Sequence, residues 1–168
     1  MIFPKWLLHG ICGLLHLVSS NIVNVIDAIE NDNVEITTIS NVESILGVKF
    51  PKDYIEIAMK NDSGYPKPNR FNFNDNEEVF NNLLSFDEED YSNIIDTYND
   101  IKDRLIGRVI PFAEDPFGNM ICFDYRSNEQ PVVVFWEHEK AFNDTESAIS
   151  YLCDTFTELI LMLHEPQE

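Results

Sequence analysis

The chain has 168 residues, of which 44% are hydrophobic and 12% aromatic, so it is long and apolar enough to bury a core as one ordinary domain. Thirty acidic residues against eleven lysines and arginines give a formal net charge of −19 at pH 7. A field of this sign repels phosphate backbones and attracts basic surfaces, which argues against DNA or RNA and for a basic protein as partner. Such an excess of acids also occurs where a protein needs it only for solubility.

The first twenty residues, MIFPKWLLHGICGLLHLVSS, differ from the rest of the chain because they are nearly free of acids. A single lysine, a mostly apolar run and the end at Ser19-Ser20 loosely resemble a secretory leader, although His9 and His16 interrupt the run. A start codon set too far upstream, or an additional helix or tail, would give the same pattern. We treat residues 1–20 as an extraneous N-terminal segment and prefer the misplaced start. No window approaches the roughly 20 apolar residues of a membrane span.

Apolar residues at helical spacing predict three short helices at the start of the domain. A run of isoleucines predicts the first over residues 22–30. Ser40 and Glu43 match a capping box and introduce the second helix, which Gly47 is placed to end in the left-handed conformation. Phe50, Tyr54, Ile57 and Ala58 share one face of the third helix, which has Pro51 near its first turn and stops at the turn-forming sequence NDSG.

The middle of the chain is predicted to hold loops, two strands and one helix. A loop rich in proline and asparagine surrounds a short strand over residues 70–73. Apolar residues over 80–86 predict a second strand, which the acidic run DEED at 87–90 ends. These acids also suit the N-terminus of a following helix, where each negative charge stabilises the positive end of the helix dipole by about 0.3–1 kcal/mol. That helix is predicted over residues 94–105 and is terminated by Gly107.

The last third of the chain predicts a sheet and a closing helix. Runs rich in β-branched and aromatic residues predict strands over residues 108–113, 119–125 and 132–136. An apolar stripe then predicts a final helix over residues 149–163.

This order of elements predicts a single α+β domain over residues 21–165, followed by a tail at residues 166–168. Its central antiparallel sheet is expected to be covered on one side by the N-terminal and C-terminal helices. The predicted core comprises Phe50, Tyr54, Ile57, Phe112, Ile121, Phe123, Val133, Phe135, Leu152, Phe156 and Leu159.

Four stretches, taken in order, resemble the SUKH superfamily, which includes the yeast regulators of cell-wall synthesis and many bacterial immunity proteins. The family's opening helix pair is similar to LGVKFPKDYIEIAMKNDSG, and its central hairpin is similar to IPFAEDPFGNMICFDY. Its next strand resembles PVVVFWEHE, and its final helix resembles SAISYLCDTFTELILML. The resemblance covers about Asn21 to His164, which is why we prefer a misplaced start for the residues before it. The sequence departs from the family pattern at Asp62-Ser63-Gly64, where Asn-Gly-Gly is usual.

The resemblance implies a binding fold that is not an enzyme and for which no cofactor is expected. For bacterial members it implies neutralisation of a toxin encoded beside the gene. The composition, rich in asparagine and isoleucine, suits a bacterium of low genomic GC content and favours this immunity branch. A regulatory interaction module of the same fold, with a partner other than a toxin, stays open. Among toxins, a nuclease fits the acidic charge because nucleases must neutralise phosphates.

The sequence EDPFGN at residues 114–119 allows a metal loop, a catalytic pocket or the corner of a hairpin. The stretch is too short and has too few oxygen ligands for the calcium-loop pattern, and no His, Cys or Ser stands nearby in a catalytic setting. Asp115, Pro116, Gly118 and Asn119 suit a turn because they supply an acceptor, a fixed φ and tolerance of positive φ. We predict a structural turn, no metal site and no catalytic residue. Familiar nucleotide, hydrolase and metalloprotease motifs are absent from the sequence.

The candidate partner-binding residues lie at this turn and at the end of the last predicted strand. They are Glu114, Asp115, Phe117, Asn119, Trp136, Glu137 and Glu139. Hairpin and strand ends gather loops, and aromatic residues flanked by charge recur at interface centres. The alternative for Trp136 is a place in the core. We interpret His138 as a rim residue rather than a base or ligand, and DEED as a capping and solvated segment.

The three cysteines, Cys12, Cys122 and Cys153, show no C-x-x-C spacing. The latter two sit in apolar patterns, where a thiol packs as a small hydrophobe. This usage favours a reducing compartment, so we predict a cytoplasmic protein. We expect a monomer or weak dimer that binds a basic protein, with neither nucleic acid nor a membrane as a partner.

Overall fold

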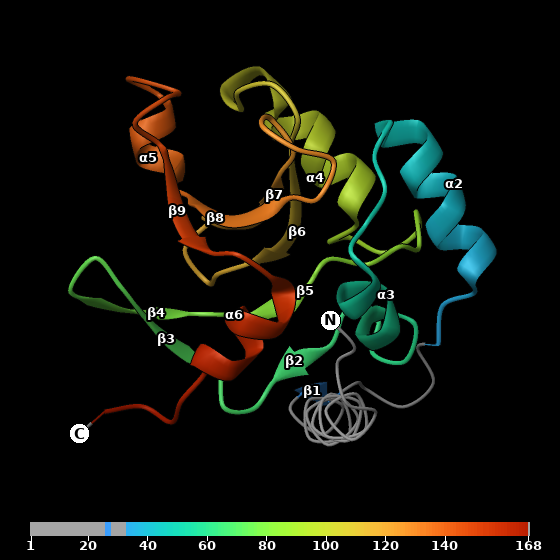
Figure 1. Ribbon diagram of the computed structural model, residues 1–168, viewed down its shortest axis with the longest axis horizontal. Coiled ribbons are helices and arrows are strands. Elements are labelled where there is room, and N and C mark those ends of the chain that lie inside the picture. Colours follow the sequence, from blue (N-terminus) through green and yellow to red (C-terminus); the bar gives the residue numbers. More distant parts are fainter. Residues whose placement is uncertain (1–25, 28–32, 168) are drawn as a thin grey trace, which may run out of the picture.

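The structure is a computed structural model that describes residues 26–27 and 33–167 (Figure 1). The segment at residues 1–20 and most of the predicted first helix lie outside the described residues. Two residues of the segment predicted as that helix are described, and they form a strand, β1 (Ile26–Asp27). This strand pairs antiparallel with β2 (Tyr65–Pro66). A helix is wrong for these two residues because they pair with a distant segment rather than along a helix.

Two helices, α2 (Ile36–Leu46) and α3 (Lys52–Ala58), confirm the next two predictions. Gly47 ends α2 at φ 67°, the left-handed conformation that the sequence indicates. Pro51 is the N-cap of α3, where its missing N–H costs nothing.

The predicted capping box at Ser40 and Glu43 is wrong, because α2 begins a turn earlier. The buried Glu43 carboxylate instead accepts hydrogen bonds from the Phe50 N–H at 2.8 Å and from Lys49 Nζ at 2.6 Å. Glu43 therefore ties the end of α2 to the start of α3.

The middle of the chain holds a hairpin of β3 (Arg70–Phe73) and β4 (Asn76–Val79), and β3 confirms the short predicted strand. The strand predicted over residues 80–86 shortens to β5 (Asn82–Leu83), because only this part pairs with the central sheet. The remaining helices are α4 (Ile94–Ile101), the 3-10 helix η1 (Lys102–Arg104), α5 (His138–Ala141) and α6 (Phe156–Met162). None of the helices in the described part of the chain is long and apolar enough to cross a membrane.

The central sheet has the strand order β5-β6-β7-β8-β9, with all neighbours antiparallel. Its four longer strands are β6 (Val109–Glu114), β7 (Met120–Asp124), β8 (Val132–Trp136) and β9 (Ile149–Cys153). The first three confirm the predicted strands, and the sheet confirms the α+β class.

The predicted helix over residues 149–163 is wrong in its first half, where the chain forms β9. Ile149 lies opposite Trp136 and Cys153 opposite Val133, so this segment continues the sheet. The helix starts only after Thr155, whose side chain accepts the Glu158 N–H at 3.1 Å and caps α6.

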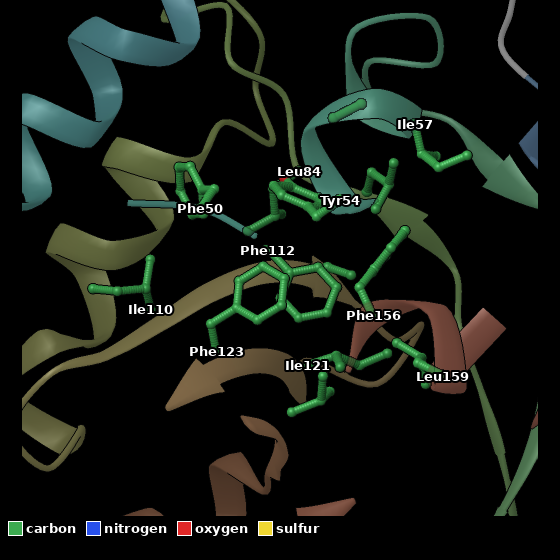
Figure 2. Packing of buried hydrophobic residues seen from close by; sticks show 14 of the residues in the cluster. Phe50, Tyr54, Ile57, Leu84, Ile110, Phe112, Ile121, Phe123, Phe156 and Leu159 are labelled. Carbon is green, nitrogen blue, oxygen red and sulfur yellow. The ribbon is translucent and has the colours of Figure 1, made fainter. Parts of the chain in front are cut away.

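The main core fills the space between one face of the sheet and α2, α3, α6 and the β3–β4 hairpin. The rings of Phe112 and Phe123 stack with centroids 4.1 Å apart, and Tyr54 and Phe156 pack on them from α3 and α6 (Figure 2). The predicted core residues are buried here, except that Leu152 is half-buried. The register shift between β8 and β9 leaves Leu152 opposite no residue of β8, which explains its partial exposure.

Helices cover both faces of the sheet, which corrects the prediction of cover on one side. A second apolar cluster lies on the opposite face and takes Met120, Cys122, Val134 and Trp136 from β7 and β8. The end of α4, with Ile101, and the end of α5, with Ala141, cover this cluster. The strands are therefore apolar on both faces, which is why they read as nearly continuous hydrophobic runs.

Cys122 and Cys153 are free and buried, and burial is the main cause that raises the pKa of both thiols, that of Cys153 to about 12. Since the thiolate is the reactive form, neither should be alkylated at pH 8 until the protein unfolds. We expect a Cys12→Ser variant, which removes the cysteine outside the described residues, to show no fast-reacting thiol in a reagent titration. A thiol that reacts equally fast in native and denatured protein would contradict this burial.

Candidate partner-binding surface

The β6–β7 turn is built around the Asp115 carboxylate. Asp115 Oδ1 accepts the backbone N–H groups of Phe117 at 2.7 Å and Asn119 at 2.8 Å, and Oδ2 accepts Asn119 Nδ2 at 2.7 Å. Gly118 takes φ 90°, a conformation that favours glycine. The predicted structural turn is confirmed. Because Asp115 is only 4% exposed and its oxygens serve the turn, it is not a free contact for a partner, as its inclusion in the candidate set supposed.

Replacing Asp115 by alanine is expected to lower the free energy of unfolding by about 1–3 kcal/mol, because the donors around it lose their acceptor. Asp115→Asn, which keeps one carbonyl oxygen, should lose less. Urea unfolding of the two variants and the original chain gives the comparison. Equal stability of all three would show that the hydrogen bonds of the turn contribute nothing net.

Asn119 joins this turn to the end of β8. Its Oδ1 lies 3.0 Å from the backbone N of His138 and 3.0 Å from His138 Nδ1. Met120 lies opposite Trp136 in the sheet, so the two strand ends meet side by side. The structure therefore brings together the two groups of candidate residues that the sequence placed about twenty positions apart. His138 is a bridging residue between them, half-buried at the rim as predicted.

Trp136 does not lie on this surface, and the alternative that it belongs to the core is confirmed. Its side chain is fully buried in the second cluster, and Nε1 donates to the Arg104 carbonyl at 3.3 Å. The Arg104 guanidinium lies 5.4 Å from the centre of its ring. Trp136 holds the sheet against η1 and is no direct contact for a partner.

The remaining candidates define the turn surface: Glu114, Phe117, Asn119, Glu137 and Glu139. Phe117 is 67% exposed and is the apolar residue of this set. Glu114 accepts the Ser92 hydroxyl at 3.0 Å, and Glu137 pairs with Lys140 at 2.5 Å, so two of the carboxylates are held in place. An exposed aromatic ring on a turn whose neighbouring strand ends carry held carboxylates suits a partner that offers an apolar pocket and basic groups.

Glu78 of β4 is an acidic neighbour of this surface that the sequence did not indicate. Burial raises the pKa of its carboxyl, and the charges of Asp115 and Glu137 raise it further. The hairpin of β3 and β4 brings Glu78 there from a part of the chain without a strong pattern. Only the three-dimensional arrangement reveals this contribution.

The acidic run at residues 87–90 is mostly exposed, as predicted, but its predicted role in capping the next helix is wrong, because Asn93 is the N-cap of α4. Asp87 accepts the Glu89 N–H at 3.0 Å, and Asp90 accepts the Ser92 N–H at 3.0 Å and the Ser63 hydroxyl at 2.9 Å. Ser63, at the position where the family usually has glycine, still takes a positive φ of 55°. Ser63 thus takes a left-handed conformation that glycine would adopt more readily.

A hollow of about 530 Å³ separates the start of α2 from this acidic run. Asp62 contributes to its wall, and its carboxylate accepts the Ser85 hydroxyl at 2.7 Å and the Phe86 N–H at 3.0 Å. These bonds fix the loop before α4 and account for Asp62 structurally. Among the described residues, no three His, Cys, Asp or Glu side chains are grouped so as to hold a metal ion.

A family model described as SMI1-KNR4 cell-wall (SUKH_6) matches residues 36–160, which is most of the chain and includes the whole central sheet. Neither the curated proteins nor the solved structures compared with the chain gave a significant match. The family includes toxin-immunity proteins and Smi1/Knr4 regulators, domains that are generally not catalytic. With its five-stranded sheet, its helices and this match, the chain belongs to the SUKH family.

Proposed function

We propose that this protein is a non-catalytic immunity protein that neutralises a cognate bacterial toxin by binding it directly. The observation that carries the proposal is the turn surface, where the β6–β7 turn with the exposed Phe117 ring is joined through Asn119 and His138 to the end of β8, next to Glu137 and Glu139 in the chain. Family membership supports a binding role, and the net charge of −19 supports a basic partner. The protein acts in the cytoplasm, where its buried thiols stay reduced.

A toxin with nuclease activity suits this surface best. A nuclease must neutralise phosphates, so its substrate groove carries lysine and arginine side chains. Carboxylates of the turn surface pair with those groups, and Phe117 enters the apolar part of the interface. The immunity protein then inhibits by covering the groove and performs no chemistry itself.

Co-expression with the toxin gene nearest to the gene of this protein tests the proposal. Cells that make the toxin domain and this protein are expected to grow, while cells that make the toxin with an unrelated acidic protein are expected to die. Loss of protection on replacing Phe117 by aspartate, with Phe142→Asp as the control at another exposed ring, would locate the interface. If the unaltered protein gives no protection, the immunity function is wrong.

The second candidate is a regulatory interaction module, and the cell-wall description of the matching family favours it. Genomic context separates the two functions. A neighbouring gene for a large secreted protein with a C-terminal toxin domain supports immunity, and the lack of one supports regulation.

A further inference from the structure

The two edges of the central sheet differ in length and in whether another segment covers them. The β5 edge is only two residues long, and its Leu83 N–H donates to the Gly64 carbonyl at 2.9 Å, so another segment covers it. At the other edge, β9 has five residues, ISYLC, without proline, lysine or any charge. β9 is the last strand in the order of the central sheet, and Figure 1 shows it on the left-hand side of that sheet. Natural proteins usually guard such an edge, because unpaired backbone groups recruit other strands.

The backbone groups that point outward from β9 follow from its pairing with β8. The Glu137 N–H donates to the Ala148 carbonyl at 2.9 Å, so Ala148 faces β8. Since antiparallel strands alternate between inward and outward residues, Ser150 also faces β8, while Ile149 and Tyr151 face away. In the part of the chain that the structure describes, no residue outside the sheet ladder bonds to the backbone of Tyr151.

The side chains near this edge set the chemistry of what can pair with it. Tyr151 is 60% exposed, and it shares a sheet face with Ile149, which packs against the second cluster. An incoming strand can therefore place an apolar residue beside the Tyr151 ring. The Tyr151 hydroxyl donates to Asp154 at 2.7 Å, which holds a carboxylate at this end of the edge.

Acidic residues lie at both ends of β9. Asp144 and Glu146 precede the strand, and Asp154 and Glu158 follow it, all with exposed side chains. Residues 141–167 contain no lysine or arginine. Arg126 is already paired with Asp124 at 2.7 Å, and this hydrogen bond is the main cause that raises the pKa of Arg126, with a smaller contribution from the charge of Glu146. A second copy of this chain would bring like charges together, whereas a strand with lysine or arginine would meet opposite ones.

We propose that the β9 edge binds an extended, basic segment of the partner protein, which adds to the sheet as a further antiparallel strand. The inference rests on the proposed function for its partner and deepens it, because it states how part of the toxin is held. The Ile149 N–H already donates to the Glu146 carbonyl at 3.4 Å, so the main-chain hydrogen bonds that give affinity are those to the N–H and carbonyl of Tyr151 and to the carbonyl of Ile149. The flanking carboxylates select for basic residues. The turn surface adjoins this edge where Glu137 bonds to Ala148, so one partner can engage both.

A short synthetic peptide of alternating lysine and valine serves as the probe. When it is added to the full chain, amide exchange at Tyr151 is expected to slow at least tenfold, because that N–H becomes hydrogen-bonded. A peptide of alternating glutamate and valine is the charge control and should leave the exchange rate unchanged. Unchanged exchange with the lysine peptide, or equal protection by both peptides, overturns the proposal.

A Tyr151→Pro variant removes the outward N–H and spares the ladder to β8, since proline is tolerated on strand edges that face solvent. Tyr151→Val is the matched control, because it loses the ring and keeps the N–H. We expect the proline variant to bind the lysine peptide about tenfold more weakly than the valine variant, and thermal melting confirms that both are folded. If the proline variant does not fold, the amide exchange at Tyr151 in the unaltered chain still tests whether the peptide pairs with β9.

The same two variants separate this inference from the proposed function. If the neighbouring toxin domain binds both variants with equal affinity, the edge proposal is wrong and the immunity function stands. If the peptide protects Tyr151 but the toxin domain does not bind the unaltered chain, the immunity function is wrong. Sedimentation that shows a dimer broken by Tyr151→Pro identifies a second copy as the occupant and overturns the basic partner strand.

Discussion

Replacing Phe156 with alanine is expected to lower the free energy of unfolding by about 3–5 kcal/mol, the usual range for emptying a buried aromatic site. Phe156 is 1% exposed, and its ring lies 5.3 Å from that of Tyr54 and 5.8 Å from that of Phe112. It links α6 to α3 and to the sheet, so its loss leaves a cavity where three elements meet (Figure 2). Denaturant unfolding of the variant and the original chain measures the difference.

Leu161→Ala is the matched control in the same helix, because Leu161 is 64% exposed. Its effect should stay within about 0.5 kcal/mol, as for most surface substitutions. If both variants are equally stable, the assignment of the buried face of α6 is wrong. The contrast also tests the helix start at Phe156, since a helix turned by one residue would bury Leu161 instead.

The strands that the sequence predicted best are those buried on both faces. In β7 and β8, residues such as Phe123 and Val133 face the main core, while Cys122 and Trp136 face the second cluster. A segment of this kind reads as a continuous β-branched and aromatic run, which predicts a strand without further information. The same two-sided burial could not be foreseen, because the sequence does not show which helix covers which face.

The segment 149–153 shows the limit of periodicity. Ile149, Leu152 and Cys153 are spaced as on one helix face and run without a break into the true helical stripe of α6. Pairing with β8 decides the structure instead, and a residue at the bulge, Leu152, shifts the alternation that would have indicated a strand. The edge on which the further inference rests was therefore hidden by the misassigned helix.

The candidate surface was predicted in part. Turn chemistry placed Glu114, Phe117 and Asn119 at a hairpin end, and the structure joins them to Glu137 through the bonds of Asn119 to His138. The sequence alone does not show whether a carboxylate accepts hydrogen bonds within the turn or faces solvent. Asp115 was therefore included among the candidate partner-binding residues. It also gives no sign of Glu78, which the β3–β4 hairpin brings close through tertiary packing.

Charge reversal of the turn surface is the second prediction with a large expected effect. Replacing Glu114, Glu137 and Glu139 by lysine should lower the rate constant for association with the toxin domain by about tenfold or more at low salt. Acidic groups on the binding face steer a basic partner toward about 10⁸–10⁹ M⁻¹s⁻¹, and reversal turns this attraction into repulsion. Stopped-flow measurements over a series of salt concentrations give the rate and its salt dependence.

A matched control separates local steering from net charge. Glu56, Asp100 and Asp103 are exposed on α3, α4 and η1, so reversing them changes the net charge equally but leaves the turn surface intact. The steering argument requires the first set to lower the rate more than the control set, with the difference vanishing at high salt because screening removes it. Melting temperatures should differ little between the sets, since Asp115, which holds the turn, is untouched in both. If the two sets slow association equally, only the overall charge matters and the partner does not approach through the turn surface.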